Sequence, residues 1–173
     1  MCYALCTRIT MINKPRFQAI YSLITRCDTI ADIGADHGKV AHYIAKSNLC
    51  KTLIVNDISP HSLQKAKIRL DVLKSVDNIK SSTALPNIKF IVCCGSELAA
   101  HIDTPIDCAI IAGIGGKEIL KIVTGLMPKS AILSPQKNAD ITKTALKNLG
   151  YTIEKDLEII DDRRKYAIFK INS

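Results

Sequence analysis

The chain has 173 residues, of which 47% are hydrophobic, and a formal net charge of +8 at pH 7. This length can bury a core without support from disulfides or metal ions, and no apolar run approaches the length that spans a bilayer. We therefore expect a cytoplasmic protein with no membrane partner. The positive charge favours a polyanionic partner, although lysine clusters more often form a solvated helix face.

The cysteines form an odd set of seven, and two of them, Cys93 and Cys94, are adjacent. No Cys-x-x-Cys pair occurs, and no clustered histidine offers the spacing that metal ligands need. We expect reduced cysteines that pack in the protein, and no metal site.

Strand-like and helix-like segments alternate along most of the chain. An amphipathic helix begins near Pro15, because proline is favoured at the first helical position. Strands are predicted at 29–33, 52–56, 88–93, 106–112 and 130–134, with helices near 39–47, 60–75, 96–101, 116–124 and 138–148. Residues 76–87 form the least regular linker. Strands that alternate with helices indicate a parallel sheet.

The C-terminal part has a different pattern. Residues 151–159 and 165–171 are β-rich runs separated by the charged Asp161-Asp162-Arg163-Arg164, which predicts a hairpin. Five βα steps followed by a hairpin fit the seven-stranded methyltransferase variant of the Rossmann fold better than a dehydrogenase, whose sixth strand usually enters by another crossover. We predict one α/β domain over residues 1–173, with an N-terminal helical segment (1–27) and a Rossmann-like core (28–173).

The most informative segment joins the first strand to its helix, where Asp32-Ile33-Gly34-Ala35-Asp36-His37-Gly38 follows a buried apolar run. Small residues here let a ligand approach the backbone. Asp32 and Asp36 suit a cationic or amine-bearing cofactor and would repel a pyrophosphate. S-adenosylmethionine carries an ammonium and a sulfonium, so it fits this loop. The alternative is that Asp36 only caps the next helix and Gly34 only makes a turn.

Two further segments belong to the same edge of the predicted sheet. Asp57 ends the second strand about 20 residues after the first loop, where ribose-binding carboxylates occur. The fourth strand ends in Ala112-Gly113-Ile114-Gly115-Gly116. Ligands bind at this edge in open α/β sheets, and glycines leave room for a planar substrate beside the cofactor. A tight strand-to-helix turn is the alternative.

Together, the segments 31–38 and 111–116 resemble motifs of the bacterial tRNA adenine-N1 methyltransferases that modify position 22. The segment Leu133-Ser134-Pro135-Gln136 resembles the family's LQPN segment, and the resemblance extends from about Arg16 to Ile171. It implies methyl transfer from S-adenosylmethionine to N1 of an adenine in tRNA. Gly95-Ser96-Glu97 stands where relatives usually have Gly-Asp-Gly, and this sequence lacks the C-terminal coiled coil that is usual in the family. We expect a monomer or weak dimer.

The resemblance also implies the residues of the site. The expected cofactor-binding residues are Asp32, Gly34, Ala35, Asp36, His37, Gly38, Asp57, Ile58, Gly95, Ser96, Glu97, Ala112 and Gly113. The expected catalytic residues are Asp36, His37, Gly113 and Gly115. Asp36 is favoured over His37 as the base that collects a proton from the exocyclic amine. Stacking on the target base would fall to Tyr43, Tyr151 or Tyr166, although packing is the simpler role for each.

Three other functions stay open at this point. The same cofactor could serve another RNA or a small molecule. The chain could instead be a cofactor-binding or RNA-binding module without turnover. A nicotinamide dehydrogenase is disfavoured because the three-glycine fingerprint is absent.

Overall fold

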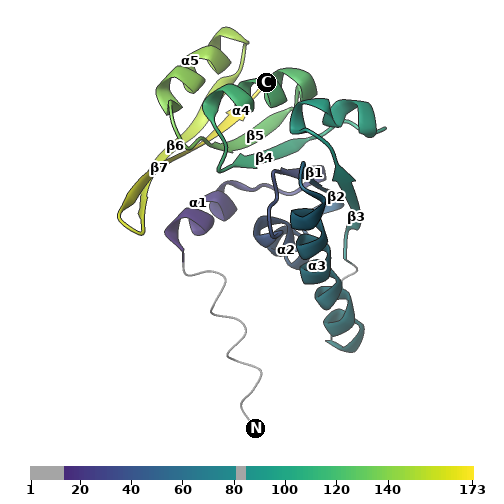
Figure 1. The fold of residues 1–173 in the computed structure, drawn as a ribbon. Helices are drawn as coiled ribbons and strands as arrows, with labels where there is room; N and C mark the ends of the chain where they lie inside the picture. Colours follow the sequence, from purple (N-terminus) through teal and green to yellow (C-terminus); the bar gives the residue numbers. More distant parts are fainter. Residues whose placement is uncertain (1–13, 81–84) are drawn as a thin grey trace.

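The computed structural model describes residues 14–80 and 85–173, without the side chains of 74–80. A seven-stranded sheet of order β3-β2-β1-β4-β5-β7-β6 forms its centre (Figure 1). Five strands are mutually parallel: β1 (Cys27–Ile33), β2 (Cys50–Asp57), β3 (Asn87–Val92), β4 (Cys108–Ala112) and β5 (Ser130–Ser134). β6 (Thr152–Asp161) and β7 (Arg164–Asn172) form a hairpin, and β7 is antiparallel to both of its neighbours. The predicted seven-stranded sheet with a terminal hairpin is confirmed.

Helices cover both faces of this sheet (Figure 1). On one face lie α1 (Pro15–Leu23), α2 (Lys39–Lys46) and α3 (Pro60–Lys80). On the other lie the 3-10 helix η2 (Gly95–His101), α4 (Gly116–Leu126) and α5 (Ala139–Asn148). The predicted linker was partly wrong, because residues 76–80 continue α3; no glycine or proline between Pro60 and Pro86 stops the helix. Residues 81–84 of that linker lie outside the described residues.

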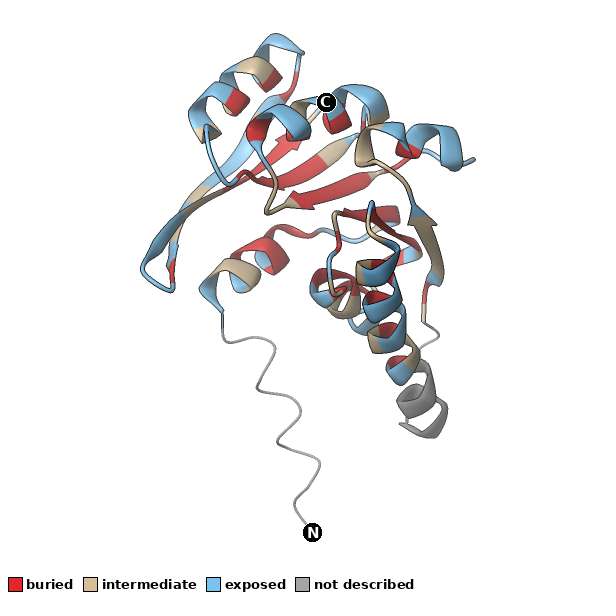
Figure 2. Cartoon of the chain, in the orientation of Figure 1, coloured by how far each residue is buried: buried red, intermediate tan, exposed pale blue. Residues whose placement is uncertain are grey.

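Alternate residues of each central strand enter opposite layers of the core. In β2, Leu53 and Val55 pack with α1, α2 and α3, whereas Ile54 packs with η2, α4 and α5. Side chains alternate in this way because successive residues of a strand point to opposite faces. The buried central strands stand out in red in Figure 2. Because both faces of these strands are buried, their sequences are continuous apolar runs.

The described cysteines are all free. Burial raises the pKa of Cys27 to about 12 and that of Cys50 to about 11, so these thiols stay protonated at neutral pH. In the described part of the chain, no helix is long and apolar enough to cross a membrane. The same residues contain no group of three or more His, Cys, Asp or Glu side chains that could hold a metal ion. Cys2 and Cys6 lie outside the described residues.

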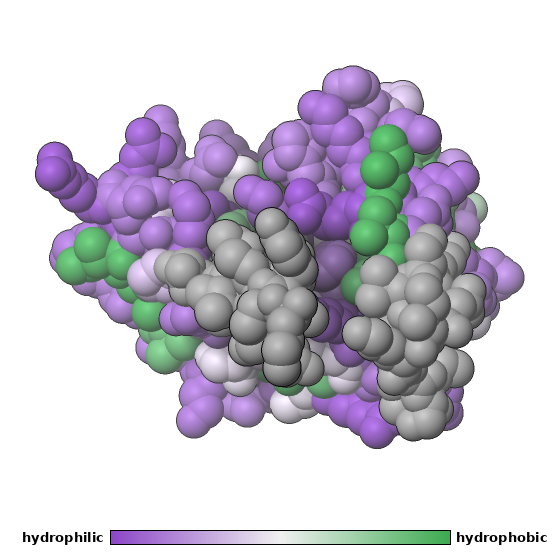
Figure 3. Space-filling model, turned by 90° about the horizontal axis from the view of Figure 1, so that it is seen from below, coloured by the Kyte–Doolittle hydropathy of each residue, from purple (hydrophilic) through white to green (hydrophobic). Residues whose placement is uncertain are grey.

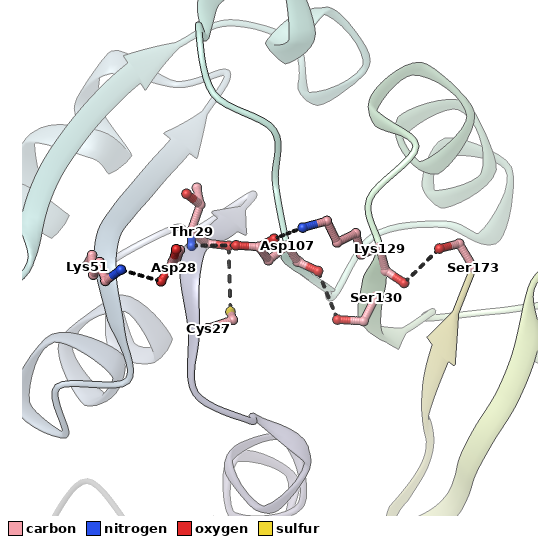
Figure 4. Close-up of polar contacts among 8 residues, drawn as sticks. All are labelled: Cys27, Asp28, Thr29, Lys51, Asp107, Lys129, Ser130 and Ser173. Carbon is pink, nitrogen blue, oxygen red and sulfur yellow. Dashed lines mark hydrogen bonds and ion pairs between the residues drawn. The ribbon is translucent and has the colours of Figure 1, made fainter.

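A polar network ties together the amino-terminal ends of β1, β4 and β5 (Figure 4). Asp107 accepts a hydrogen bond from Lys129 Nζ at 2.6 Å and another from the Thr29 N–H at 3.0 Å. The Ser130 hydroxyl donates to the Asp107 carbonyl at 3.0 Å, and the Ser173 N–H donates to the Lys129 carbonyl at 2.9 Å. This edge of the sheet is therefore held by its own side chains and the end of β7.

Candidate active site

A cavity of about 640 Å³ lies at the opposite edge, where β1, β2 and β4 end. Ligands of open parallel sheets bind at this edge, next to the crevice where the strand order reverses. Most of the predicted site residues line it: Asp32, Gly34, Ala35, Asp36, His37, Asp57, Ile58, Gly95, Ala112 and Gly113. Gly38, Ser96, Glu97 and Gly115 are not among its lining residues.

The loop between β1 and α2 has an unusual backbone that the end of β2 holds in place. Gly34, Asp36 and Gly38 have φ angles of 69°, 49° and 67°. The N–H groups of Gly34 and Ala35 donate to the Asn56 carbonyl at 3.0 and 2.9 Å. Left-handed conformations are accessible to glycine and, among other residues, best to Asn and Asp. The residue types of this loop therefore match its shape.

Gly38 serves packing between helices. A Cβ atom at Gly38 would lie 2.7 Å from the Cβ of Ala66 in α3. Only a residue without a side chain lets the start of α2 approach α3 so closely. We expected Gly38 to bind the cofactor, and it is not among the residues that line the cavity, so this role stays a prediction.

Asp32 is buried at the end of β1 and holds the start of α2. Its Oδ2 accepts a hydrogen bond from the Ala41 N–H at 2.9 Å, which satisfies a donor in the first turn of the helix. Burial raises the pKa of Asp32 to about 7, and the negative charge of Asp57 adds to that rise, against the Ala41 hydrogen bond. From the sequence we expected Asp32 to accept hydrogen bonds from a ligand. In the structure its carboxyl group also holds the start of α2.

Asp57 is buried at the end of β2, and backbone donors orient both of its oxygens. Oδ2 accepts from the Asp36 N–H at 2.9 Å, and Oδ1 accepts from the Ser59 N–H at 2.8 Å. A carboxylate oxygen has more than one acceptor position, so Asp57 can still accept hydroxyl donors from the cavity. The next residue, Ile58, is 71% exposed and adds apolar surface to the cavity wall.

Asn56 is a functional residue that sequence reasoning missed. Its side-chain amide donates to the carbonyls of Ile91 and Cys93 at 3.0 and 3.1 Å, while its own carbonyl holds the β1–α2 loop. Asn56 therefore connects the loop after β1 to the end of β3. The available signal was a polar amide at the end of an otherwise apolar strand.

Asp36 and His37 lie at the cavity wall with their side chains accessible. The Asp36 side chain is 70% exposed, and its Oδ1 lies 3.5 Å from His37 Nε2. Two basic residues of α3 approach His37: Lys65 Nζ lies 3.5 Å from Nε2, and Arg69 Nε donates to the His37 carbonyl at 2.8 Å. The two candidate bases are thus neighbours, and they lie beside positive charge.

The turn between β4 and α4 is supported by the segment after β5. Gly113 has a φ of 83°, and its N–H donates to the Ser134 carbonyl at 3.0 Å. The Gln136 side-chain amide donates to the Gly113 carbonyl, and the Gln136 N–H donates to the Ile114 carbonyl at 2.9 Å. A Cβ at Gly115 would meet nothing within 4 Å. The glycine at 115 therefore leaves open space next to the site.

The turn after β3 differs from our expectation. Cys94 and Gly95 line the cavity, whereas Ser96 and Glu97, the next residues of η2, are not among its lining residues. A Cβ at Gly95 would lie 2.8 Å from Ile33 Cγ2, so the turn packs tightly on the end of β1. An adenine contact made directly by this turn would come from residues 94 and 95, and Ser96 Oγ lies 3.2 Å from Cys94 Sγ.

Helix α1 forms a wall of the cavity that sequence reasoning did not include. Arg16 and Phe17 both line it. The Arg16 guanidinium carbon lies 4.7 Å from the centre of the Tyr166 ring, and Lys14 Nζ binds the Asp162 carboxylate at 2.7 Å. The helix is therefore fastened to the β6–β7 hairpin.

The three candidate stacking tyrosines are engaged in packing. Tyr43 stacks on Tyr21 with ring centres 3.8 Å apart, and Tyr166 lies beneath Arg16. Tyr151 is buried, and its hydroxyl donates to the Pro128 carbonyl at 3.3 Å. Phe17 is the aromatic ring among the lining residues of the cavity.

Comparisons with known proteins agree with this geometry. A family model described as a methyltransferase domain matches residues 13–169. A Mycoplasma genitalium protein named "Putative tRNA methyltransferase" is 25% identical over 162 residues, which are 91% of this chain and 69% of that protein. M. capricolum TrmK, solved with S-adenosylhomocysteine, has a TM-score of 0.78 at 23% identity, with 91% of this chain and 67% of that chain covered.

A second solved structure has the same fold. Streptococcus pneumoniae Sp1610, described as "a putative tRNA (m1A22) methyltransferase", has a TM-score of 0.76 at 20% identity, over 91% of this chain and 69% of that one. These proteins share their fold with the chain along about two thirds of their own length. With a family model that matches nearly all of its residues, the chain belongs to the methyltransferase domain family.

Proposed function

We propose that this protein transfers a methyl group from S-adenosylmethionine to N1 of an adenine in tRNA, at position 22. The observation that carries the proposal is the cavity at the ends of β1, β2 and β4, where a buried carboxylate faces a glycine-rich turn in a methyltransferase chain. The names of the M. genitalium and S. pneumoniae proteins support tRNA as acceptor, and the latter supports the position.

The cavity fits the cofactor in size and in chemistry. Ligand cavities usually have volumes of about 300–1,000 Å³, and this one has about 640 Å³. Asp57 can accept the ribose hydroxyls, and Ile58 with Cys94 and Gly95 offers a surface for adenine. At Gly34, a Cβ would meet only Ile114 Cγ2, at 3.9 Å, so the loop leaves room for a chain of atoms to pass close to its backbone.

In this reaction the protein need not form a covalent bond with either reactant. The cofactor supplies an electrophilic methyl group on a sulfonium sulfur. The N1 lone pair of neutral adenine lies in the ring plane, so the cavity wall at Gly113 and Ala112 must hold the base edge-on towards that methyl group. Alignment of this kind supplies much of such a barrier. The new N1–C bond forms as the C–S bond breaks and its electron pair stays on sulfur.

Asp36 is the base in this proposal. Methylation leaves a positive charge on the adenine ring, and loss of a proton from its exocyclic amine removes that charge. The accessible Asp36 carboxylate at the cavity wall can accept this proton. His37 lies next to it: its Nε2 is 3.5 Å from Asp36 Oδ1 and 3.5 Å from Lys65 Nζ.

Basic residues gather in two parts of the sequence, and the two groups have different surroundings: Lys65, Lys67, Arg69, Lys74 and Lys80 after the second strand, and Lys137, Lys143 and Lys147 near α5. On α3, Lys65 and Arg69 contact His37 and so bring positive charge to the edge of the cavity. On α5, Lys143 binds the Asp156 carboxylate at 2.6 Å, which neutralises it locally. Much of the described surface is hydrophilic in Figure 3, with hydrophobic patches between. We propose that the α3 side of the cavity faces the phosphates of the acceptor, because phosphate contacts dominate affinity for nucleic acids.

The test is methyl transfer from labelled S-adenosylmethionine into unmodified tRNA, followed by nucleoside analysis. We expect label in 1-methyladenosine, and no label in a matched tRNA whose adenine 22 is replaced by guanine. Equal labelling of both tRNAs would contradict the position. Saturable binding of S-adenosylhomocysteine without any label in tRNA would point to another RNA or a small molecule. Absence of a saturable site would point to a module without turnover.

A further inference from the structure

Arg16 is a charged side chain in the cavity wall that the proposed reaction leaves without a role. Its guanidinium lies 4.7 Å above the Tyr166 ring, and its Nη2 would be 3.2 Å from a Cβ at Gly113. The Nε of Arg16 is buried and has no hydrogen-bond acceptor among the described residues. A glycine at position 113 therefore makes the space into which this guanidinium fits.

A guanidinium held in this way is suited to an anion. Arginine stays charged in proteins and presents its donors as a rigid fork that matches a carboxylate or phosphate. A buried donor without an acceptor destabilises the fold unless packing or a ligand compensates. The Tyr166 ring fixes the plane of the fork through a cation–π contact, so an incoming anion need not order the side chain.

The cavity has two ends of different chemistry. Asp57 and Ile58 end β2, next to β3, and offer the ribose and adenine contacts. Gly34 and Gly113 end β1 and β4, on the other side of Asp57 in the strand order. A nucleoside placed on Asp57 therefore extends its amino-acid arm across Gly34 towards Gly113, where Arg16 lies.

That arm carries an ammonium and a carboxylate. Asp36 and Glu118 both line the cavity, and their negative charges suit the ammonium and the sulfonium but repel the carboxylate. Lys39 is the other long cation of the wall, and its Nζ lies 5.7 Å from the centre of the Phe17 ring. The guanidinium of Arg16 lies against the Gly113 backbone, at the end of the arm, so it is better placed than Lys39 to bind the carboxylate.

We propose that Arg16 binds the carboxylate of the amino-acid part of S-adenosylmethionine through its guanidinium fork. This inference rests on the proposed function, since it assigns one group of that cofactor. It makes Arg16 a specificity residue, which distinguishes the complete cofactor from adenosine compounds that lack a carboxylate.

The test is a cycle of two ligands and two proteins, measured by isothermal titration on the full chain. The ligands are S-adenosylhomocysteine and its decarboxylated analogue, which keeps the nucleoside, the thioether and the amine. We expect the wild type to prefer the complete ligand about 10- to 100-fold, the range of a hydrogen-bonded charge pair. Arg16→Met should lose this preference and bind the analogue as the wild type does.

Two further variants act as controls. Arg16→Lys keeps the charge without the fork and should retain part of the preference. Arg26→Met removes an exposed arginine that does not line the cavity, and should leave both affinities unchanged. Unchanged binding of the analogue by Arg16→Met shows that the variant is folded.

Several results would overturn the inference. An equal loss of affinity for both ligands would make Arg16 a structural residue, and an undiminished preference in Arg16→Met would exclude it as the carboxylate ligand. Loss of tRNA binding with intact cofactor preference would assign it to an acceptor phosphate instead. If the wild type itself lacks a saturable site for S-adenosylhomocysteine, the proposed function fails and the inference fails with it.

Discussion

Two buried carboxylates at the edge of the sheet have separate tasks. Asp32 points its oxygen at the start of α2, and Asp57 points its oxygens at the loops that follow β1 and β2. Both bind backbone N–H groups, which pre-organises the cavity wall before a ligand arrives. The Asp36 side chain, by contrast, is 70% exposed at the cavity wall.

Asp36→Asn tests the assignment of the base. Asparagine tolerates the positive φ of this position, and its N–H can still donate to Asp57. We expect the methyl-transfer rate at saturating cofactor to fall about 10²- to 10⁴-fold, the usual contribution of a general base. Single-turnover kinetics measure the rate. Normal turnover in Asp36→Asn together with its loss in His37→Asn would transfer the role to His37.

Asp57→Ala tests the ribose contact. We expect cofactor binding to weaken by about 1.5–3 kcal/mol, the scale of hydrogen bonds to a charged group, because both the ribose acceptor and the anchor of the Asp36 N–H are lost. Titration with S-adenosylhomocysteine measures it. Asp28→Ala is the matched control, since this exposed carboxylate binds Lys51 at 2.9 Å, at the start of β1. Equal affinities in wild type and Asp57→Ala would refute the ribose assignment.

Asp32→Asn tests the effect of burial on a charge. The pKa of Asp32 is about 7 in the folded chain and about 4 in an unfolded one. The folded state therefore binds a proton that the unfolded state has released between these pH values. In this range Asp32 is ionised in the unfolded chain and protonated in the folded one. The free energy of unfolding therefore falls by a few kcal/mol as pH rises from about 4 to 7.

The asparagine variant resembles the protonated acid at every pH. We expect the free energy of unfolding of Asp32→Asn to rise relative to that of the wild type as pH increases over this window. Urea denaturation at several pH values measures the difference. If the difference in free energy of unfolding between variant and wild type did not depend on pH, folding would not raise the pKa of Asp32.

At the scale of elements, the start of α2 depends on its close approach to α3. Gly38→Ala places a Cβ 2.7 Å from the Ala66 Cβ at a φ of 67°. We expect the free energy of unfolding to fall by about 2–5 kcal/mol, from about 1–2 for the left-handed backbone and about 1–3 for overpacking. Gly150→Ala is the control, since its φ is 91° and no atom lies within 4 Å. Denaturant unfolding should show only the backbone cost there.

The contact can be tested further in a double variant. Ala66→Gly in the background of Gly38→Ala removes the opposing Cβ, so it should recover part of the overpacking cost; the rest stays, because the Ala66 Cα lies 2.9 Å from the new Cβ. A double variant no more stable than Gly38→Ala, after correction for glycine in a helix, would show that the helices do not pack as described.

The order and type of the elements were predictable, and so was the edge of the sheet that carries the cavity. Apolar runs between β-branched residues specify buried strands, and glycines mark the turns at 34–38 and 113–116. The irregular parts were less predictable. The end of α3 and the 3-10 form of η2 depend on packing and local hydrogen bonds, which the spacing of apolar residues in the sequence does not reveal.

The site was predictable where its residues follow strands, because carboxyl ends of parallel strands meet at one edge. The contributions of Asn56 and Arg16 were not. Asn56 acts through carbonyls at 91 and 93, and Arg16 lies on Tyr166, so each role depends on a contact between distant parts of the chain. A motif that is local in sequence cannot report such a contact.

The two edges of the sheet carry different features. The amino-terminal edge carries the Asp107 network, and the carboxyl edge carries the cavity. The Lys129 hydrogen bond holds the pKa of Asp107 below its usual value. Asp107 therefore stabilises the fold at neutral pH, and this contribution is lost as pH falls through its lowered pKa.

We expect Asp107→Asn to lower the melting temperature at pH 7 while it leaves the affinity for S-adenosylhomocysteine unchanged. The loss of stability between pH 7 and pH 3 should be smaller in the variant than in the wild type. Differential scanning fluorimetry over this pH range, with titration at pH 7, measures both. A large change in affinity would show that the two edges are coupled through the strands.

The attachment of α1 to the hairpin has a consequence for synthesis of the chain. Arg16 and Phe17 are among the first described residues to leave the ribosome, but Tyr166, which supports Arg16, is among the last. The strands β1 to β5 can pair while the hairpin is still in the exit tunnel, yet the cavity then lacks a fixed wall. In a nascent chain the cavity is therefore complete only after the hairpin has left the exit tunnel, so a ligand of the complete cavity cannot guide the earlier stages of folding.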